Sequence, residues 1–251
     1  MDFGGIRALN HLDLDVCSGE IVALIGPNGA GKTTFFNCVT GIYVPTAGEV
    51  LLTPRQGGKT LRLNGLKPNT VTEKGLARTF QNIRLFSKMT VLENVMIGRH
   101  CRTKAFIFGA IFRTPATRRE EQDIAEKSYM LLEKVGLADQ ANEFAQNLSY
   151  GAQRRLEIAR ALATEPVLLL LDEPAAGMNP QETRELVELI RAISADGQAI
   201  LLIEHDMKLV MSLSDRIFVM DYGKKIAEGS PAEIRANPAV IKAYLGEEVD
   251  A

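Results

Sequence analysis

Five short stretches of the chain are strongly apolar and have the length of β-strands. They are residues 12–16, 21–25, 167–171, 199–203 and 217–220. Helical stretches separate several of them, and strands that alternate with helices along a chain predict an α/β core. No internal repeat or low-complexity tract interrupts the pattern, so we expect one globular unit.

Residues 86–165 differ because they lack long β-branched runs. A helical pattern extends from 117 to 135, with one apolar face and Gly136 as a C-terminal stop. We therefore predict a helical subdomain, 86–165, inserted between two parts of the core, 1–85 and 166–251. An apolar run at 105–112 is too short to span a bilayer; it fits an internal hydrophobic hairpin or a contact with a membrane partner.

The sequence GPNGAGKTT, residues 26–34, follows one apolar run and precedes a helical stretch that can continue to Gly41. Its spacing G-x-x-x-x-G-K-[ST] is that of a phosphate-binding loop. Glycines let the backbone approach phosphate oxygens, and the positive end of the helix dipole faces the anion. We expect Lys32 to reach the β- and γ-phosphates and Thr33 to bind Mg²⁺. The candidate nucleotide contacts are Gly26, Pro27, Asn28, Gly29, Ala30, Gly31, Lys32, Thr33 and Thr34.

Two carboxylates, Asp172 and Glu173, follow the apolar run 167–171. Side chains alternate along a strand, so the two carboxylates point to opposite sides and can take separate roles. Asp172 is a candidate to hold Mg²⁺ through water, and Glu173 is a candidate to polarise the attacking water. Many strands end in acidic residues, so this pair alone is weak evidence. Together with the phosphate loop, Asp172 and Glu173 predict nucleotide hydrolysis.

About twenty residues before Asp172 stands LSYGAQ, residues 148–153, followed by RRLEIARAL. The stretch resembles the LSGGQ signature of the ATP-binding cassette (ABC) ATPases. Tyr150 replaces a glycine and Ala152 a glutamine, whereas Ser149 and Gly151, which bind phosphate in the family, are kept. The resemblance implies a second phosphate site at the start of a helix; a simple N-cap role for Ser149 is the alternative.

Three further residues occur along the chain in the same order as functional residues of the ABC ATPases. Gln81, in RTFQ, resembles the Q-loop glutamine that contacts Mg²⁺ and water and links the core to the helical subdomain. His205, in IEHD, resembles the switch histidine that contacts the γ-phosphate. Phe3 is the only aromatic residue before the phosphate loop and resembles the residue that stacks on adenine; a core side chain is the alternative. Family members usually carry an extra edge strand before this point, so we expect a truncated start.

Composition narrows the range of partners. The chain has 251 residues, a net charge of −2 and 46% hydrophobic residues, with basic residues spread among acidic ones, so we expect no nucleic-acid partner. The three cysteines are widely separated and argue against a disulfide framework or a zinc site. No signal sequence or apolar run of about 20 residues occurs. We expect a protein that is soluble when isolated and peripheral on the cytoplasmic face of the cell membrane.

Several later stretches look like the ATP-binding subunit of branched-chain amino-acid importers. They are RTFQNIRLF (78–86), the insertion around 100–120, DEPAAG (172–177) and the tail with NP at 237–238 and AYLG at 243–246. This resemblance covers nearly the whole chain. It implies a single ABC ATPase domain, 1–251, with a P-loop NTPase core, an inserted α-helical subdomain and N-terminal antiparallel β elements.

The resemblance also implies partners. A second ABC ATPase subunit, of the same chain or a homologue, is expected to form a head-to-tail dimer around two ATP molecules. Two membrane permease subunits and, indirectly, an extracytoplasmic solute-binding protein complete the importer. In that arrangement residues 176–180 form the D-loop at the dimer contact.

Other functions stay open at this point. The ATPase of a lipopolysaccharide exporter has a similar tail. Among non-transport ABC proteins, a DNA-repair clamp needs long coiled-coil heptads, which do not occur here. An iron-sulfur assembly scaffold is disfavoured by the tail and the insertion, and copurification with membrane subunits would discriminate between it and an importer.

Overall fold

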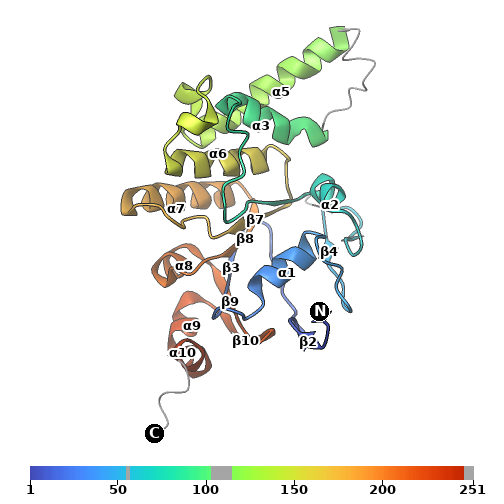
Figure 1. Ribbon diagram of the computed structural model, residues 1–251, viewed down its shortest axis with the longest axis vertical. Helices are drawn as coiled ribbons and strands as arrows, with labels where there is room; N and C mark the ends of the chain where they lie inside the picture. Colours follow the sequence, from blue (N-terminus) through green and yellow to red (C-terminus); the bar gives the residue numbers. More distant parts are fainter. Residues whose placement is uncertain (55–56, 103–114, 246–251) are drawn as a thin grey trace.

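The computed structural model describes residues 1–54, 57–102 and 115–245. At its centre lies a six-stranded sheet in the order β10-β9-β3-β8-β7-β6 (Figure 1). All its pairings are parallel except that of β10 with β9. The strands are β3 (Ile21–Ile25), β6 (Leu76–Arg78), β7 (Leu168–Asp172), β8 (Ala199–Ile203), β9 (Arg216–Asp221) and β10 (Lys224–Gly229). The predicted α/β core is therefore confirmed.

The carboxyl ends of the central strands meet at one edge of the sheet. Every residue of β3 and β8 is buried, as their unbroken apolar sequences predict for strands covered on both faces. Asp172, the last residue of β7, pairs with Ile203 at the end of β8, and Leu24 of β3 pairs with the same residue. The loops that follow these three strands are consequently neighbours, which is where open α/β sheets bind ligands.

Alternation along the strands divides the core into two layers. Val22 and Leu24 point toward α1 (Lys32–Val39), where Phe36 is fully buried. Ala23 and Ile25 belong to the cluster on the other face. That face is covered by α7 (Pro180–Ala195) and α8 (Met207–Leu213), and the remaining helices of the core are α2 (Pro68–Lys74), α9 (Pro231–Ala236) and α10 (Pro238–Leu245).

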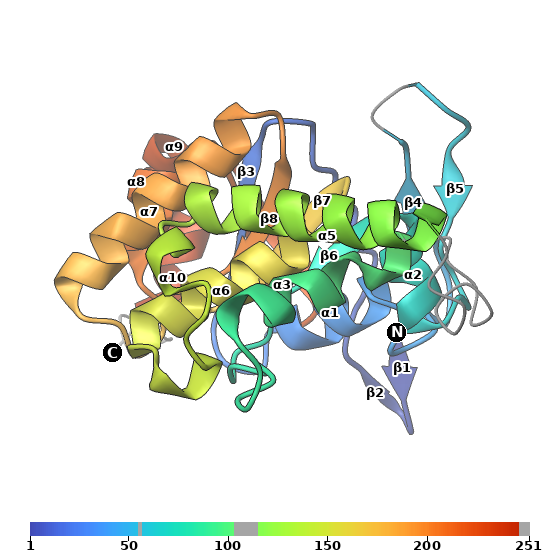
Figure 2. The same ribbon diagram turned by 90° about the horizontal axis from the view of Figure 1, so that it is seen from above.

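Residues 86–165, as far as they are described, form helices joined by loops. The elements are α3 (Val91–Arg99), η1 (His100–Arg102), α5 (Pro115–Lys134), η2 (Ala138–Gln140), η3 (Ala145–Asn147) and α6 (Tyr150–Leu162). Figure 1 shows α3, α5 and α6 gathered at one end of the molecule, with α6 next to α7, and Figure 2 shows α5 along the outer surface. The exact boundaries of the subdomain stay a prediction.

Helix α5 agrees closely with the pattern that predicted a helix over 117–135. Ser128 and Leu132 are buried on its inner face, and Val135, directly after the helix, is buried as well. Gly136 follows with φ +68°, a left-handed conformation that commonly ends helices. The apolar run at 105–112 lies outside the described residues. None of the helices in the described ranges is both long and apolar enough to cross a bilayer.

The N-terminal part contains two antiparallel pairs, as the family resemblance implies. They are β1 (Asp2–Phe3) with β2 (Ile6–Arg7), and β4 (Leu51–Leu52) with β5 (Leu61–Arg62).

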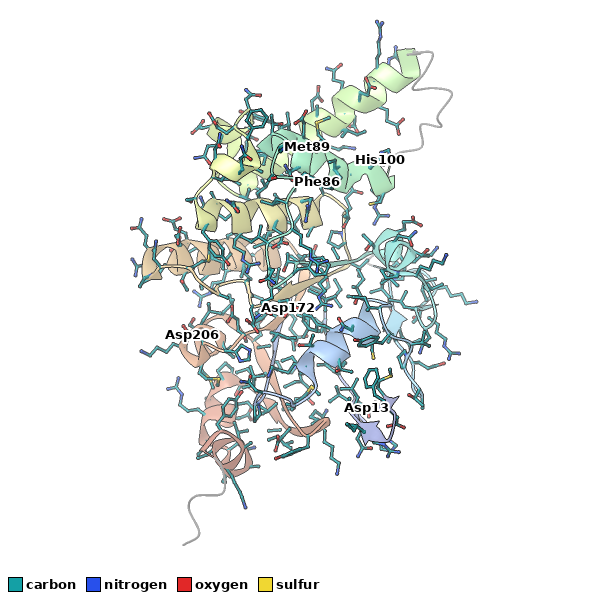
Figure 3. The ribbon with its side chains drawn as sticks, in the orientation of Figure 1. Asp13, Phe86, Met89, His100, Asp172 and Asp206 are labelled. Atoms are coloured by element: carbon teal, nitrogen blue, oxygen red, sulfur yellow. The ribbon has the colours of Figure 1, made fainter. Side chains whose placement is uncertain are left out.

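The strand predicted at residues 12–16 is wrong, because this segment is irregular. Its apolar side chains still alternate inward and pack on the core, whereas Asp13 (Figure 3) and Asp15 are exposed. Alternating burial therefore does not by itself make a strand; a paired backbone is also required.

Candidate active site

The phosphate loop, residues 26–34, connects β3 to α1. A Cβ at Gly26 would lie 2.1 Å from the carbonyl oxygen of Met220, and one at Gly31 would lie 2.6 Å from that of Ala8. Gly31 also has φ +104°, which other residues rarely adopt. The backbone can therefore follow this path only with glycine at both positions.

Lys32 opens α1 and is 7% exposed. Its Nζ donates hydrogen bonds to the carbonyl oxygens of Gly26, at 2.6 Å, and Pro27, at 2.9 Å. Burial lowers the pKa of Lys32, and the negative charge of Glu173 opposes this shift. Because α1 begins without a side-chain cap, the N–H groups of its first turn can serve an anion. The ammonium group and the helix start thus form one positive site.

The other predicted contacts in the loop differ in exposure. Asn28, Gly29 and Thr33 are exposed, Pro27 and Thr34 are half-buried, and Ala30 is buried.

Asp172 ends β7 at the carboxyl edge of the sheet (Figure 3) and forms a buried ion pair that the sequence did not predict. Arg78, the last residue of β6, donates from Nη2 to Asp172 Oδ2 at 2.6 Å. Its Nη1 donates to Asn37 of α1 at 2.8 Å, and its guanidinium lies 5.3 Å from the ring centre of Phe36. Arg78 therefore joins the carboxylate of β7 to the helix that follows the phosphate loop.

Three predicted catalytic side chains are brought together at Glu173. Its Oε2 accepts a hydrogen bond from Nε2 of Gln81 at 2.7 Å, and its Oε1 lies 2.8 Å from Nε2 of His205. Glu173 has φ +47°, so its backbone is left-handed at a residue that is not glycine. A carboxylate held between an amide and an imidazole at a strand end can accept a proton from water.

The residues predicted to hold Mg²⁺ fit the chemistry of that ion. Thr33 supplies a hydroxyl, Asp172 a carboxylate and Gln81 an amide oxygen, and Mg²⁺ prefers such oxygen ligands. Because Gln81 uses its Nε2 to reach Glu173, its oxygen is the end that can bind a cation. The carboxylate of Asp172 is already held by Arg78 through Oδ2.

Ser149 and Gly151 lie at the start of α6, which Figure 1 shows above the level of α1, the helix that follows the phosphate loop. Ser149 caps α6, its Oγ accepting from the backbone N–H of Ala152 at 3.3 Å. The N–H of Gly151 donates to Oε1 of Glu182 at 3.3 Å, and a Cβ at Gly151 would be 2.7 Å from that oxygen. Within one chain these contacts hold Ser149 and Gly151 to α6 and α7.

Phe3 is also not brought to the phosphate loop. Its ring packs edge-on against Tyr43, with the centroids 5.3 Å apart, and Phe3 is 40% exposed. Tyr43 follows the C-terminal end of α1, whereas the loop precedes its N-terminal end. A role in stacking on adenine stays a prediction.

Besides Arg78, two buried charged residues next to the site were missed by sequence reasoning. Glu204 accepts from the backbone N–H of Ala175 at 2.8 Å and of His205 at 3.1 Å, and burial raises its pKa. Arg154, on α6, donates to the backbone carbonyls of Phe80 and Gln81. The acid directly before His205 was a usable signal, whereas nothing local to Arg154 indicates its partners.

A family model described as "ABC transporter" matches residues 9–176. The chain belongs to the ABC transporter ATP-binding family. The resemblance inferred from the phosphate loop, LSYGAQ and the carboxylate pair is thus confirmed. A second model, described as "Branched-chain amino acid ATP-binding cassette transporter", matches residues 224–250 of this ABC protein.

Curated relatives of this ABC ATPase are similar over nearly its whole length. The high-affinity branched-chain amino acid transport ATP-binding protein LivG of Salmonella typhimurium is 51% identical over 248 residues, 98% of this chain and 95% of that protein. BraF of Pseudomonas aeruginosa, with the corresponding description, is 49% identical over the same shares.

Solved structures share the fold of this ABC ATPase. The ADP conformation of MJ1267, an ATP-binding cassette of an ABC transporter, has a TM-score of 0.81 and 32% identity, covering 98% of this chain and 95% of that one. The dimeric structure of the bacterial ABC transporter cassette MJ0796 has a TM-score of 0.72 and 25% identity, covering 90% and 91%. The chain is therefore an ABC transporter ATPase that binds ATP or ADP and couples hydrolysis to transport.

Proposed function

We propose that this chain is the ATP-hydrolysing subunit of an importer of branched-chain amino acids. The observation that carries the solute assignment is its match to LivG and BraF over 98% of its length, together with the matching tail at residues 224–250. The observation that supports hydrolysis is the contact of Gln81 and His205 with Glu173 beside the phosphate loop.

The side chains divide the reaction among them. Lys32 and the first turn of α1 bind the β- and γ-phosphates. Thr33, Asp172 and Gln81 would hold Mg²⁺, which would offset phosphate charge when ATP is bound. Glu173 orients and deprotonates the attacking water, and His205 contacts the γ-phosphate while it holds the Glu173 carboxylate in place.

A second ATPase subunit, of the same chain or a homologue, completes each nucleotide site. The placement of Ser149 and Gly151 at the start of α6, in the helical subdomain, supports a head-to-tail dimer in which they bind the ATP of the opposite subunit. Closure of such a dimer depends on ATP and reopening depends on hydrolysis, which gives the stroke of transport.

The dimer docks on two permease subunits at the cytoplasmic face of the membrane, and an extracytoplasmic solute-binding protein delivers the amino acid. Phe86 is 48% exposed and lies near Met89 on the helical side of Asp172 (Figure 3). With the half-buried Leu85, these side chains offer an apolar surface to a short helix of a permease.

Reconstitution tests this function. The chain is purified with its permease subunits, placed in liposomes with ATP and Mg²⁺, and assayed for uptake of leucine, isoleucine and valine delivered by the binding protein. We expect ATP-dependent uptake that the Glu173→Gln variant abolishes. ATP hydrolysis without uptake of any of the three would reject the solute assignment and leave the ATPase assignment standing.

A further inference from the structure

Arg154 is a fully buried charge that connects α6 to the segment carrying Gln81. The residue is 2% exposed. Its Nη1 donates to the carbonyl oxygen of Phe80 at 2.6 Å, and its Nη2 donates to the carbonyl oxygen of Gln81. One guanidinium thus holds two successive peptide groups of the chain that follows β6.

The guanidinium is fixed from its own helix as well. Glu157, one turn further along α6, accepts from Arg154 at 3.1 Å, and both side chains are 2% exposed. Glu157 also accepts from the backbone N–H of Arg84 at 3.4 Å, so the pair grips the same segment at a second point. A buried charge is costly unless it is paired and hydrogen-bonded; Arg154 is paired with Glu157 and hydrogen-bonded through both Nη atoms.

Tyr150 adds a connection to the loop that follows Glu173. Its hydroxyl accepts from Arg154 at 3.2 Å, and its ring lies against Gly177, where an added Cβ would be 3.4 Å away. Tyr150 is the residue that replaces a glycine of the family signature, and Gly177 lies in the D-loop. The substitution therefore supplies an aromatic bridge between α6 and the loop after Glu173.

We propose that Arg154 is a positioning residue for hydrolysis: by binding the carbonyls of Phe80 and Gln81 to α6, it sets where the Gln81 amide meets Glu173. Gln81 contacts Glu173 at 2.7 Å, so a displacement of α6 is transmitted through two peptide groups to the catalytic carboxylate. The proposal rests on the proposed catalytic role of Gln81. It adds that the position of α6, the helix bearing Ser149 and Gly151, determines the position of the Gln81 amide.

The guanidinium geometry is specific to this task. Its planar fork presents N–H groups that two neighbouring oxygens can share, whereas a lysine ammonium is a compact point charge on a flexible stem. Arg154→Lys therefore keeps the charge next to Glu157 but loosens the hold on the two carbonyls. Arg155→Lys is a matched control, because Arg155 is adjacent on α6 and pairs with Glu185 of α7 rather than with the Gln81 segment.

The experiment compares both variants in the full-length protein, alone and combined with Gln81→Ala. We expect Arg154→Lys to lower kcat about tenfold, the effect of losing one charge-assisted hydrogen bond. ATP affinity should stay within about twofold because the phosphate loop is untouched. In the Gln81→Ala background the further loss should be less than about twofold, because Arg154 then has no side chain left to position. Arg155→Lys should resemble the wild type.

Hydrogen exchange gives a readout that does not depend on activity. Amides of residues 79–84 should exchange faster in Arg154→Lys while those of β7 and β8 keep their protection, which also shows that the variant is folded. If Arg154→Lys does not fold, Glu157→Gln, which removes only the counter-charge, should change exchange and kcat in the same direction.

Equal losses of kcat from Arg154→Lys with and without Gln81 would overturn the proposal, as would unchanged exchange at 79–84. If Gln81→Ala alone leaves kcat intact, the role of Gln81 fails and the positioning role fails with it. Faster exchange would in that case show only that Arg154 holds the segment.

Discussion

Glu173→Gln separates nucleotide binding from hydrolysis with the smallest possible change. The variant keeps the size of the side chain and removes its charge. The carboxylate now accepts from Gln81 at 2.7 Å and lies 2.8 Å from His205. A glutamine at this position can still accept from Gln81 through its oxygen and donate from its nitrogen to Nε2 of His205. The contacts of the site are therefore kept.

The size of the effect follows from the role of the lost group. An amide cannot take a proton from water, and a positioned general base contributes about 10²–10⁴ in rate. We expect hydrolysis to fall at least about 100-fold, or about 2.7 kcal/mol in the activation free energy. The charge of Glu173 also helps to raise the pKa of the buried Glu204, so its removal relieves one repulsion and the fold should keep its stability.

The assay uses purified protein with ATP and Mg²⁺, measuring turnover of phosphate and the oligomeric state by gel filtration. The variant should bind ATP and persist as a dimer, because in the proposed dimer closure needs ATP and reopening needs hydrolysis. Glu185→Gln, an identical change at a surface ion pair, is the control and should hydrolyse ATP normally. A Glu173→Gln protein that turns over at the wild-type rate and stays monomeric with ATP would refute this reasoning.

Four further changes test other parts of the molecule. Lys32→Ala should abolish ATPase activity and weaken ATP binding with the fold intact, whereas wild-type turnover would reject the phosphate site. Ser149→Arg should spare ATP binding to the monomer but prevent closure of the dimer. When Ser149→Arg chains are mixed with Lys32→Ala chains, each heterodimer should contain at most one intact nucleotide site, so full two-site activity would exclude head-to-tail pairing. Phe86→Asp, at an exposed position, should leave soluble ATPase activity intact but abolish amino-acid uptake in the reconstituted complex, and normal uptake would remove the docking surface. Leu170→Ala, in the fully buried centre of β7, should lower the free energy of unfolding by about 2–5 kcal/mol in a denaturant titration, and a loss below about 1 kcal/mol would contradict its place in the core.

The sequence predicts what is encoded locally. The phosphate loop is a contiguous motif with a strand before it and a helix after it, and Asp172 and Glu173 end an apolar run, so both could be placed from neighbouring residues. Gln81 and His205 were found through the family's order alone. Their contact with Glu173 emerges only when parallel strands bring distant loops to one edge of the sheet.

Other features depend on partners that no local pattern reveals. Arg78 meets Asp172 across 94 positions of sequence, and Arg154 meets Phe80 across 74. The predicted strand at 12–16 failed for a related reason, because pairing depends on which backbone lies beside it. Composition and periodicity describe one segment at a time. These interactions each join two distant segments, so neither segment alone predicts them.

The left-handed backbone conformation of Glu173 lowers the stability of the fold at a residue that we propose is needed for ATP hydrolysis. A residue with a Cβ at φ +47° carries roughly 1–2 kcal/mol of strain, which glycine would not feel. Glu173→Gly is thus an unusual substitution, because it can remove backbone strain from the fold while it removes the proposed general base. Selection of variants for heat resistance alone would be expected to drift toward glycine here and yield sturdier proteins that no longer hydrolyse ATP. Under the role proposed for Glu173, stability and turnover therefore favour different residues at this one position.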